Sequence, residues 1–304
     1  MKSGTSHLLG SITILSILIL GWELLSRVVT AKGSYGEPLV PGWGYLLGNS
    51  LLRMSDYWEG GYGIPAPSQG GSATYAAALL ALGGASLVTF ERVFFGIVFG
   101  TLSGVGLGLL VATSNLSRRL IAPTVHIVRM TPFLAMIPLF NLWFGANTSG
   151  IILFVAYGVA VIMFIGTANA VRNVPRVFLD RAATVGANRA AIFRHIILPA
   201  IFPEIRASFL LSFGLSWSLV VAGELLGAQS GLGVIVTYAL QFAYTGRVMI
   251  VAFLFIIYAG LSFALFDAVS RRIIDWHPQV DRRPPDRSLG NIKRLRNSVR
   301  RCTR

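Results

Sequence analysis

Long apolar runs separated by short polar segments dominate the chain. A helix needs about 20 apolar residues to cross a bilayer, and six runs approach or reach that length. They lie at residues 8–25, 93–112, 120–144, 151–171, 201–226 and 249–269. We interpret the first as an uncleaved helix, because Trp22 and Glu23 stand where a signal peptide would need small residues. The pattern predicts an all-α polytopic membrane protein with about six transmembrane helices.

The second of these spans is preceded by two segments of different character. Residues 31–72 are rich in Gly, Pro and aromatic residues, which favours a loop with short helical turns near a membrane interface. Residues 76–87 are apolar but too short for a span, so we expect an interfacial or re-entrant helix there. The resulting layout is a first transmembrane helix (1–30), an extracytoplasmic loop with the interfacial helix (31–88), a five-helix core (89–272) containing a polar loop at 173–199, and a basic tail (273–304).

Composition narrows the class further. Hydrophobic residues make up 54% of the chain and charged residues only 12%, which excludes a soluble globule and a disordered chain. Cys302 is the single cysteine, and the four histidines are scattered, so we expect no disulfide framework and no metal site. None of the three lysines follows a glycine, which excludes an ATP-binding P-loop. We therefore predict no catalytic residues and no cofactor in this chain.

The uneven distribution of basic residues orients the helices. If the N-terminus is cytoplasmic, the inside segments hold 19 of the 26 Lys and Arg residues, eleven of them after position 270. Such a bias marks the cytoplasmic side, so both termini are predicted to be cytoplasmic. The basic tail follows an apolar span directly, which favours contact with anionic lipid over binding of nucleic acid.

The segment at 173–199 is unusual for a connection between two spans. Apolar residues recur at helical spacing on both sides of Gly186, and Pro199 opens the next span. These features predict a compact helix–turn–helix whose apolar face needs a partner.

This segment resembles the loop that marks the permease subunits of bacterial ABC importers. That loop has the pattern E-A-A, three residues, Gly, nine residues, then I-x-L-P. The matching positions here are Asp180, Arg181, Ala182, Gly186, Ile196, Leu198 and Pro199. Arg181 departs from the usual Ala, and Asp180 is shorter than Glu.

Further motifs resemble the nitrate, sulfonate, taurine and bicarbonate branch of these permeases. They are residues 89–93, 129–132, 137–138, 142–145 and 222–233. The resemblance implies an inner-membrane protein of a prokaryote that pairs with a second, similar or identical permease. It also implies two ATP-binding cassette subunits that bind ATP and Mg, a binding protein that delivers the solute, and a role for the loop in docking to the ATPases.

Four polar residues are candidates for the translocation path or its gate. Arg129 lies deep in a predicted span, where it could attract an anion, reach the inner surface, or tie down helix ends around Pro132. Glu224 could gate the path, contact the binding protein, pair with an arginine such as Arg247, or cap a helix. Asn141 and Gln229 could line the path or form interhelical hydrogen bonds.

One helical stripe of glycines predicts close packing. Gly96, Gly100, Gly104 and Gly108 recur every four residues, which allows two helices to approach closely, within the chain or between subunits.

Two alternatives remain open at this stage. An ion-coupled secondary transporter would need carboxylates deep in the membrane and often an internal repeat; most acids here lie near span ends. An ABC permease for another small organic solute would share every feature above.

Overall fold

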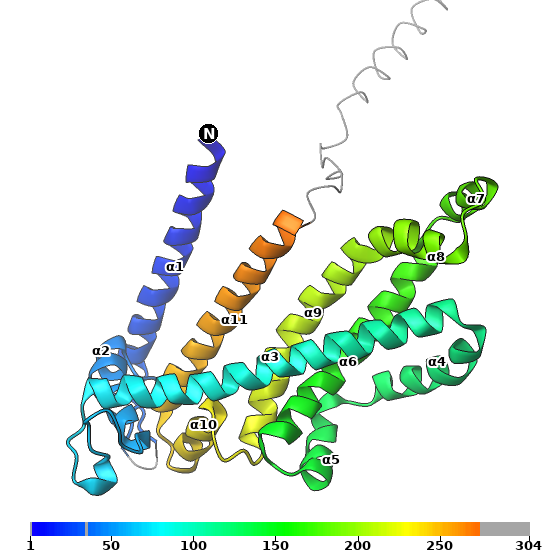
Figure 1. The fold of residues 1–304 in the computed structure, drawn as a ribbon. Helices are drawn as coiled ribbons and strands as arrows, with labels where there is room; N and C mark the ends of the chain where they lie inside the picture. Colours follow the sequence, from blue (N-terminus) through cyan, green and yellow to red (C-terminus); the bar gives the residue numbers. More distant parts are fainter. Residues whose placement is uncertain (1, 34–35, 274–304) are drawn as a thin grey trace, which may run out of the picture. The chain divides into compact units, whose positions relative to one another are not determined.

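A computed structural model describes residues 2–33 and 36–273. The chain forms two compact units, residues 1–265 and residues 266–304. Nearly all of the second unit, including the predicted basic tail, lies outside the described residues. The described part is helical, with two isolated β-bridges. Its helices are α1 (Lys2–Val28), α2 (Trp43–Tyr45), α3 (Tyr75–Thr113), α4 (Asn115–Met130), α5 (Phe133–Phe144), α6 (Thr148–Asn173), α7 (Arg176–Thr184), α8 (Arg189–Ile192), α9 (Leu198–Leu225), α10 (Leu232–Gln241) and α11 (Thr245–Ile273) (Figure 1).

The long apolar helices agree with the predicted spans. Among the described residues, four helical stretches are long and apolar enough to cross a membrane, and a fifth arises if α4 and α5 count as one bent span. The four are Tyr75–Thr113, Thr148–Asn173, Arg189–Leu225 and Thr245–Ser270. The first predicted span, residues 8–25, falls within α1. The all-α, multi-helix prediction is confirmed.

The expected interfacial helix at 76–87 is not a separate element. Instead, α3 runs without a break for 39 residues, from Tyr75 to Thr113. The side chain of Thr74 caps its start by accepting a hydrogen bond from the N–H of Ala77, and no proline interrupts it. At 1.5 Å per residue, α3 is about 58 Å long, roughly twice the hydrocarbon thickness of a bilayer.

The predicted span at 120–144 breaks at only one of its three prolines. The helices α4 and α5 meet at an angle of 106°. Pro132 lies at this junction, whereas Pro123 and Pro138 lie inside the two helices. Because residue Thr131 precedes a proline, it is driven into an extended conformation (ψ 128°), which ends α4.

The glycine stripe of α3 packs against α6 within the chain. A methyl group added at Gly100 would lie 2.6 Å from Cβ of Val159 and 2.7 Å from the carbonyl oxygen of Ala156. Gly96, Gly104 and Gly108 face α6 in the same way. The prediction of close helix packing is therefore confirmed, and the contact is intramolecular.

Aromatic residues join the segment 31–72 to α1 and α11. Trp43 stacks on Phe253 with ring centroids 5.6 Å apart, and its indole N–H donates to the carbonyl of Ile19. The indole of Trp22 donates to the carbonyl of Pro41. This segment contains short turns, namely a π turn at Leu46–Ser50 and 3-10 turns at Leu52–Tyr57 and Pro67–Gln69, as its composition predicts.

Candidate functional site: an exposed helical turn and a buried ion pair

The segment between α6 and α9 folds into the predicted helix–turn–helix. The helix α7 ends at Thr184, and Gly186 just beyond it has a φ of +80° that few residues other than glycine adopt readily. Two backbone hydrogen bonds close this end, from the N–H of Gly186 to the carbonyl of Ala183 and from Ala187 to Ala182. The side chain of Asn188 then caps α8 by accepting from the N–H of Ala191 at 2.7 Å. A π turn, Phe193–Ile197, leads straight into α9.

The motif residues occupy this turn and the start of α9. Asp180 and Arg181 lie exposed on α7, and Ala182 beside them is half-buried. Ile196 is half-buried in the π turn, whereas Leu198 and Pro199 are exposed in the first turn of α9.

Part of the expected apolar face is covered by the chain itself. Leu179 and Ile197 pack against a small core of Ala170, Val174 and Ile201. Three other apolar side chains of the turn, Val177, Phe178 and Val185, are exposed by 57%, 53% and 87%. Exposed apolar side chains grouped in this way are typical of an interaction surface.

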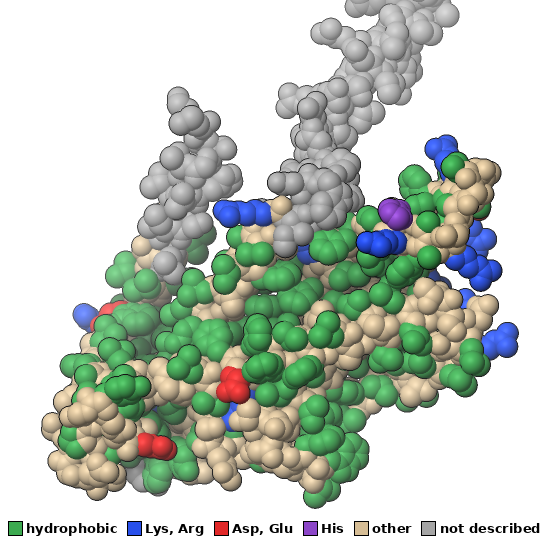
Figure 2. Space-filling model, viewed as in Figure 1, with side chains coloured by type: hydrophobic (Ala, Val, Ile, Leu, Met, Phe, Trp, Pro, Cys, Tyr) green, Lys and Arg blue, Asp and Glu red, His purple; other side chains and the backbone are tan. Residues whose placement is uncertain are grey.

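The turn is also strongly basic. It carries four arginines, Arg176, Arg181, Arg189 and Arg194, against the single acid Asp180. Lys and Arg side chains gather around α4, α7 and α8, while Asp and Glu side chains appear over the other half of the same face, where some lie beside a basic side chain (Figure 2). This charge separation agrees with the bias read from the sequence.

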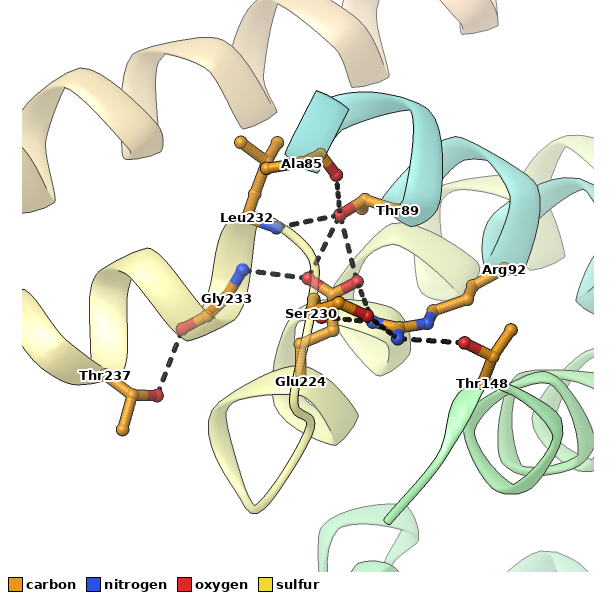
Figure 3. Close-up of polar contacts among 9 residues, drawn as sticks. All are labelled: Ala85, Thr89, Arg92, Thr148, Glu224, Ser230, Leu232, Gly233 and Thr237. Carbon is orange, nitrogen blue, oxygen red and sulfur yellow. Dashed lines mark hydrogen bonds and ion pairs between the residues drawn. The ribbon is translucent and has the colours of Figure 1, made fainter. Parts of the chain in front are cut away.

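A second site is a fully buried ion pair between α3 and α9. Nη1 of Arg92 lies 2.8 Å from Oε1 of Glu224, and both side chains are at most 1% exposed. Thr89, one turn before Arg92, donates its hydroxyl to the same carboxylate at 2.9 Å. The N–H of Gly233, in the first turn of α10, donates to Oε2 at 2.8 Å (Figure 3). The carboxylate therefore binds a cation and caps a helix.

The guanidinium of Arg92 holds the connection between α9 and α10. Nη1 donates to the carbonyl of Ser230 at 2.7 Å, and Nη2 donates to the hydroxyls of Ser230 and Thr148. Asn141 of α5 donates to the carbonyl of Leu226 in the same connection. Residues 226–231 are thus bonded to α3 and α5, and Arg92 also bonds the start of α6.

Two glycines make room for this network. Gly231 has a φ of +104°, and a methyl group there would lie 2.8 Å from Nη1 of Arg92. A side chain at Gly233 would clash with Glu224. The Gly-Leu-Gly spacing at 231–233 is therefore what lets a buried carboxylate reach the start of α10.

The structure decides between some of the alternatives for the polar candidates. Glu224 pairs with Arg92 and caps α10; the suggested partner Arg247 instead pairs with Asp56 at 2.8 Å. The pairing of Glu224 with Arg247 was wrong because the guanidinium of Arg247 is engaged by Asp56 of the segment 31–72, whereas Arg92 reaches the Glu224 carboxylate. Asn141 forms a hydrogen bond between elements. Arg129, in the last turn of α4, and Gln229 are exposed.

The sequence reasoning missed Thr89, Arg92 and Ser230 as site residues. A signal existed, because an arginine inside an apolar helix needs a buried partner or water. A span that starts at residue 93 leaves Arg92 just outside it, which conceals the position of this residue in the middle of α3.

Comparison with known proteins identifies the family. Residues 104–275 match the family described as binding-protein-dependent transport system inner membrane component. The chain belongs to this family. The predicted resemblance to ABC importer permeases is confirmed: the chain is a permease subunit of an ABC importer and a multi-pass protein of the inner membrane. The match gives no support to the secondary-transporter alternative.

Similar proteins include several transport permeases. The putative aliphatic sulfonates transport permease protein SsuC of Bacillus subtilis is 29% identical over 62% of this chain and 68% of its own length. The taurine permease TauC of Escherichia coli is 30% identical over 63% of this chain and 70% of its own length. The nitrate import permease NrtB of Leptolyngbya laminosa is 29% identical over 60% of this chain and 63% of its own length.

A solved structure shares the fold. An inward-facing structure of the MetNI methionine ABC transporter has a chain that aligns with a TM-score of 0.54 and 24% identity, over 66% of this chain and 99% of that chain. At this identity the likeness concerns the fold alone. Membership of the family implies an ATPase and a solute-binding protein as partners.

Proposed function

We propose that this permease imports a small solute with an oxyanion group, such as nitrate, a sulfonate, taurine or a bicarbonate-like anion. The names of the similar permeases SsuC, TauC and NrtB support this solute class. Another small organic solute is the alternative, because family membership alone fixes no solute. Arg129 and Gln229 remain the proposed path or gate residues, since both are exposed. Asn141 and Glu224 act on the path by holding the connection at 226–231.

The turn at 176–197 is proposed to dock onto the ATPase, with Asp180, Arg181, Ala182, Gly186, Ile196, Leu198 and Pro199 forming or shaping the contact. The observation that carries this proposal is the turn itself, whose exposed Val177, Phe178 and Val185 need a partner. It joins α9 directly, and the helical stretch Arg189–Leu225 is about 55 Å long. A push on the turn is therefore transmitted along α9 to Glu224. ATP and Mg would bind to the ATPase.

A second copy of the chain is proposed to complete the path. An apolar groove of about 740 Å³ lies between α3, α5 and α6, lined by Phe99, Met136, Phe140 and Trp143 among others. Trp143 in its lining is 62% exposed, and the neighbouring Leu142 is 80% exposed. A homodimer would cover this groove, and lipid would cover the remaining apolar surface.

The proposed topology and layout follow the sequence. The basic turn and both termini lie on the cytoplasmic side, and the segment 31–72 lies outside. Residues 1–30, 31–88, 89–272 and 273–304 serve as the first helix, the outer segment, the permease core and a tail that contacts anionic lipid.

Co-purification with the ATPase tests the docking turn. Valine at position 186 would be strained by about 1–2 kcal/mol, because a β-branched residue disfavours a positive φ. We expect Gly186→Val to lose most of the associated ATPase. Gly36→Val is the matched control, since Gly36 also has a positive φ (+78°) and open space around it, but lies in the outer segment. Equal ATPase recovery with both variants would contradict a docking role for the turn.

A further inference from the structure

A cleft of about 650 Å³ opens between the segment 31–72, the first half of α3 and α10. Its walls include Trp58 and Glu59 from the outer segment, Gln229 and Ser230 from the connection, and Tyr238 from α10. The Ser230 wall is fixed by Arg92, which bonds both its carbonyl and its hydroxyl. Most of the cleft lies outside residues 104–275, so the family match assigns it no role.

The charge of the cleft is opposite to that of the chain. The protein carries a net charge of +14, yet the charged residues among the described lining are two acids, Asp56 and Glu59, and no Lys, Arg or His. Asp56 is neutralised by Arg247, with 2.8 Å between Nη2 and Oδ2. Glu59 is exposed and has no ion pair within the described part of the chain. One uncompensated negative charge therefore remains at the cleft.

Aromatic residues line the same cleft as Glu59. Tyr57, Trp58 and Tyr238 all line the cleft. An adjoining smaller pocket shares Asp56, Tyr57 and Tyr238, and there the chain's own Arg247 occupies such a setting. The guanidinium carbon of Arg247 lies 4.3 Å from the ring centroid of Tyr244 and 5.6 Å from that of Tyr57. A carboxylate beside aromatic faces is the usual environment for a bound organic cation.

A strained turn presents a tyrosine beside the cleft. Tyr62 has a φ of +48°, which is rare for a bulky residue, and is 89% exposed. Two backbone hydrogen bonds between Gly61 and Ile64 close the turn, and the ring of Tyr62 stacks on the cleft residue Trp58 at 6.5 Å. Backbone strain of this kind concentrates at binding sites, and exposed tyrosines often anchor protein interfaces.

We propose that this cleft receives an arginine or lysine side chain of the solute-binding protein. This inference rests on the proposed function, which supplies the solute-binding protein as the partner and places the cleft on the outer side of the membrane. An open cleft leaves a small free cation largely hydrated, so cation–aromatic contacts there are weak on their own. A basic side chain on a protein surface binds more strongly, because the rest of that surface also contacts the permease, including Tyr62. The single charge of Glu59 then orients the docked protein.

Charge-selective thiol labelling tests the cleft. The protein is Ser68→Cys in a Cys302→Ser background, because Ser68 is exposed and lines the cleft. The probes are two methanethiosulfonates of similar size, one carrying trimethylammonium and the other sulfonate. We divide the rate of labelling by the cationic reagent by the rate for the anionic reagent. We expect this ratio to be about five times higher for Ser68→Cys than for a free thiol, the effect of one charge at close range in water. Glu59→Gln should remove this preference, whereas Glu91→Gln, an exposed acid on α3 outside the cleft, should leave it. A preference equal to that of a free thiol, or unchanged by Glu59→Gln, would overturn the proposal.

Protection experiments identify the source of the cation. The solute-binding protein of this importer should slow labelling of Ser68→Cys at micromolar concentration, and Glu59→Lys should weaken that protection at least tenfold. Protection by millimolar ethylguanidinium but not by the binding protein would overturn the docking assignment. Co-purification with the ATPase is measured on the same Glu59→Lys sample. If Glu59→Lys still co-purifies with the ATPase but is no longer protected by the binding protein, the cleft proposal is supported. If the wild type itself does not co-purify with the ATPase, the result counts against the proposed function.

Discussion

Arg92 and Glu224 lie 132 positions apart in the sequence, yet their charged groups are 2.8 Å apart and shielded from the surface. Each charge is costly to bury alone and is compensated by the other and by the hydroxyls, the Ser230 carbonyl and the N–H group around them. The pair joins α3 to the end of α9 and, through Ser230 and Gly233, to the start of α10.

Removing one member of this pair should destabilise the protein strongly. In Glu224→Gln the charge of Arg92 remains buried without its counter-ion, which should lower the free energy of unfolding by about 3 kcal/mol. Titration with sodium dodecyl sulfate, followed by tryptophan fluorescence, measures the change. The control is Arg27→Gln, which breaks the exposed pair with Glu23 and should cost less than about 1 kcal/mol. The double variant Arg92→Met, Glu224→Leu should recover part of the loss. Similar midpoints for Glu224→Gln and Arg27→Gln would contradict this view of the pair.

The glycine stripe gives a second prediction. Gly100→Ala places a methyl group 2.6 Å from Cβ of Val159, so α3 and α6 must separate, at a cost of about 1–3 kcal/mol. Gly106→Ala lies on the same helix with open space around it and should be neutral or slightly stabilising. The same detergent titration compares the two variants. If Gly100→Ala is as stable as Gly106→Ala, the close contact does not contribute as described.

The contacts of Arg247, which anchor the segment 31–72, give a third prediction. Arg247→Gln removes the ion pair with Asp56 and the stacking on Tyr57 and Tyr244. A loss of about 1.4 kcal/mol corresponds to tenfold more frequent local opening. Limited proteolysis should therefore cleave residues 31–72 about ten times faster. Arg53→Gln, which removes an exposed contact to Asn49 in the same segment, should leave the rate nearly unchanged.

Much of the fold could be predicted because it depends on local pattern. Span length, the four-residue glycine repeat and the turn at Gly186 are all properties of neighbouring residues. The expectation of a separate interfacial helix at residues 76–87, ending before Glu91, is where local reasoning misled. Glu91 and Arg92 resemble the polar end of a span, yet α3 continues through them because Arg92 is neutralised by Glu224.

The buried network could not be predicted for a related reason. Its members come from α3, α6, α9 and α10, and no spacing rule connects Thr89 or Arg92 to Ser230. The sequence shows that Glu224 needs a partner but does not select Arg92 over Arg247. That choice depends on how α10 folds back after the glycines at 227 and 231.

Solute uptake by reconstituted complexes tests the central claim most directly. The permease, its ATPase and its binding protein are placed in proteoliposomes with labelled taurine or nitrate, with ATP or a non-hydrolysable analogue inside. We predict uptake only with hydrolysable ATP, and loss of uptake in Gly186→Val but not in Gly36→Val. Uptake by the permease alone, driven by an ion gradient without ATP, would contradict the account.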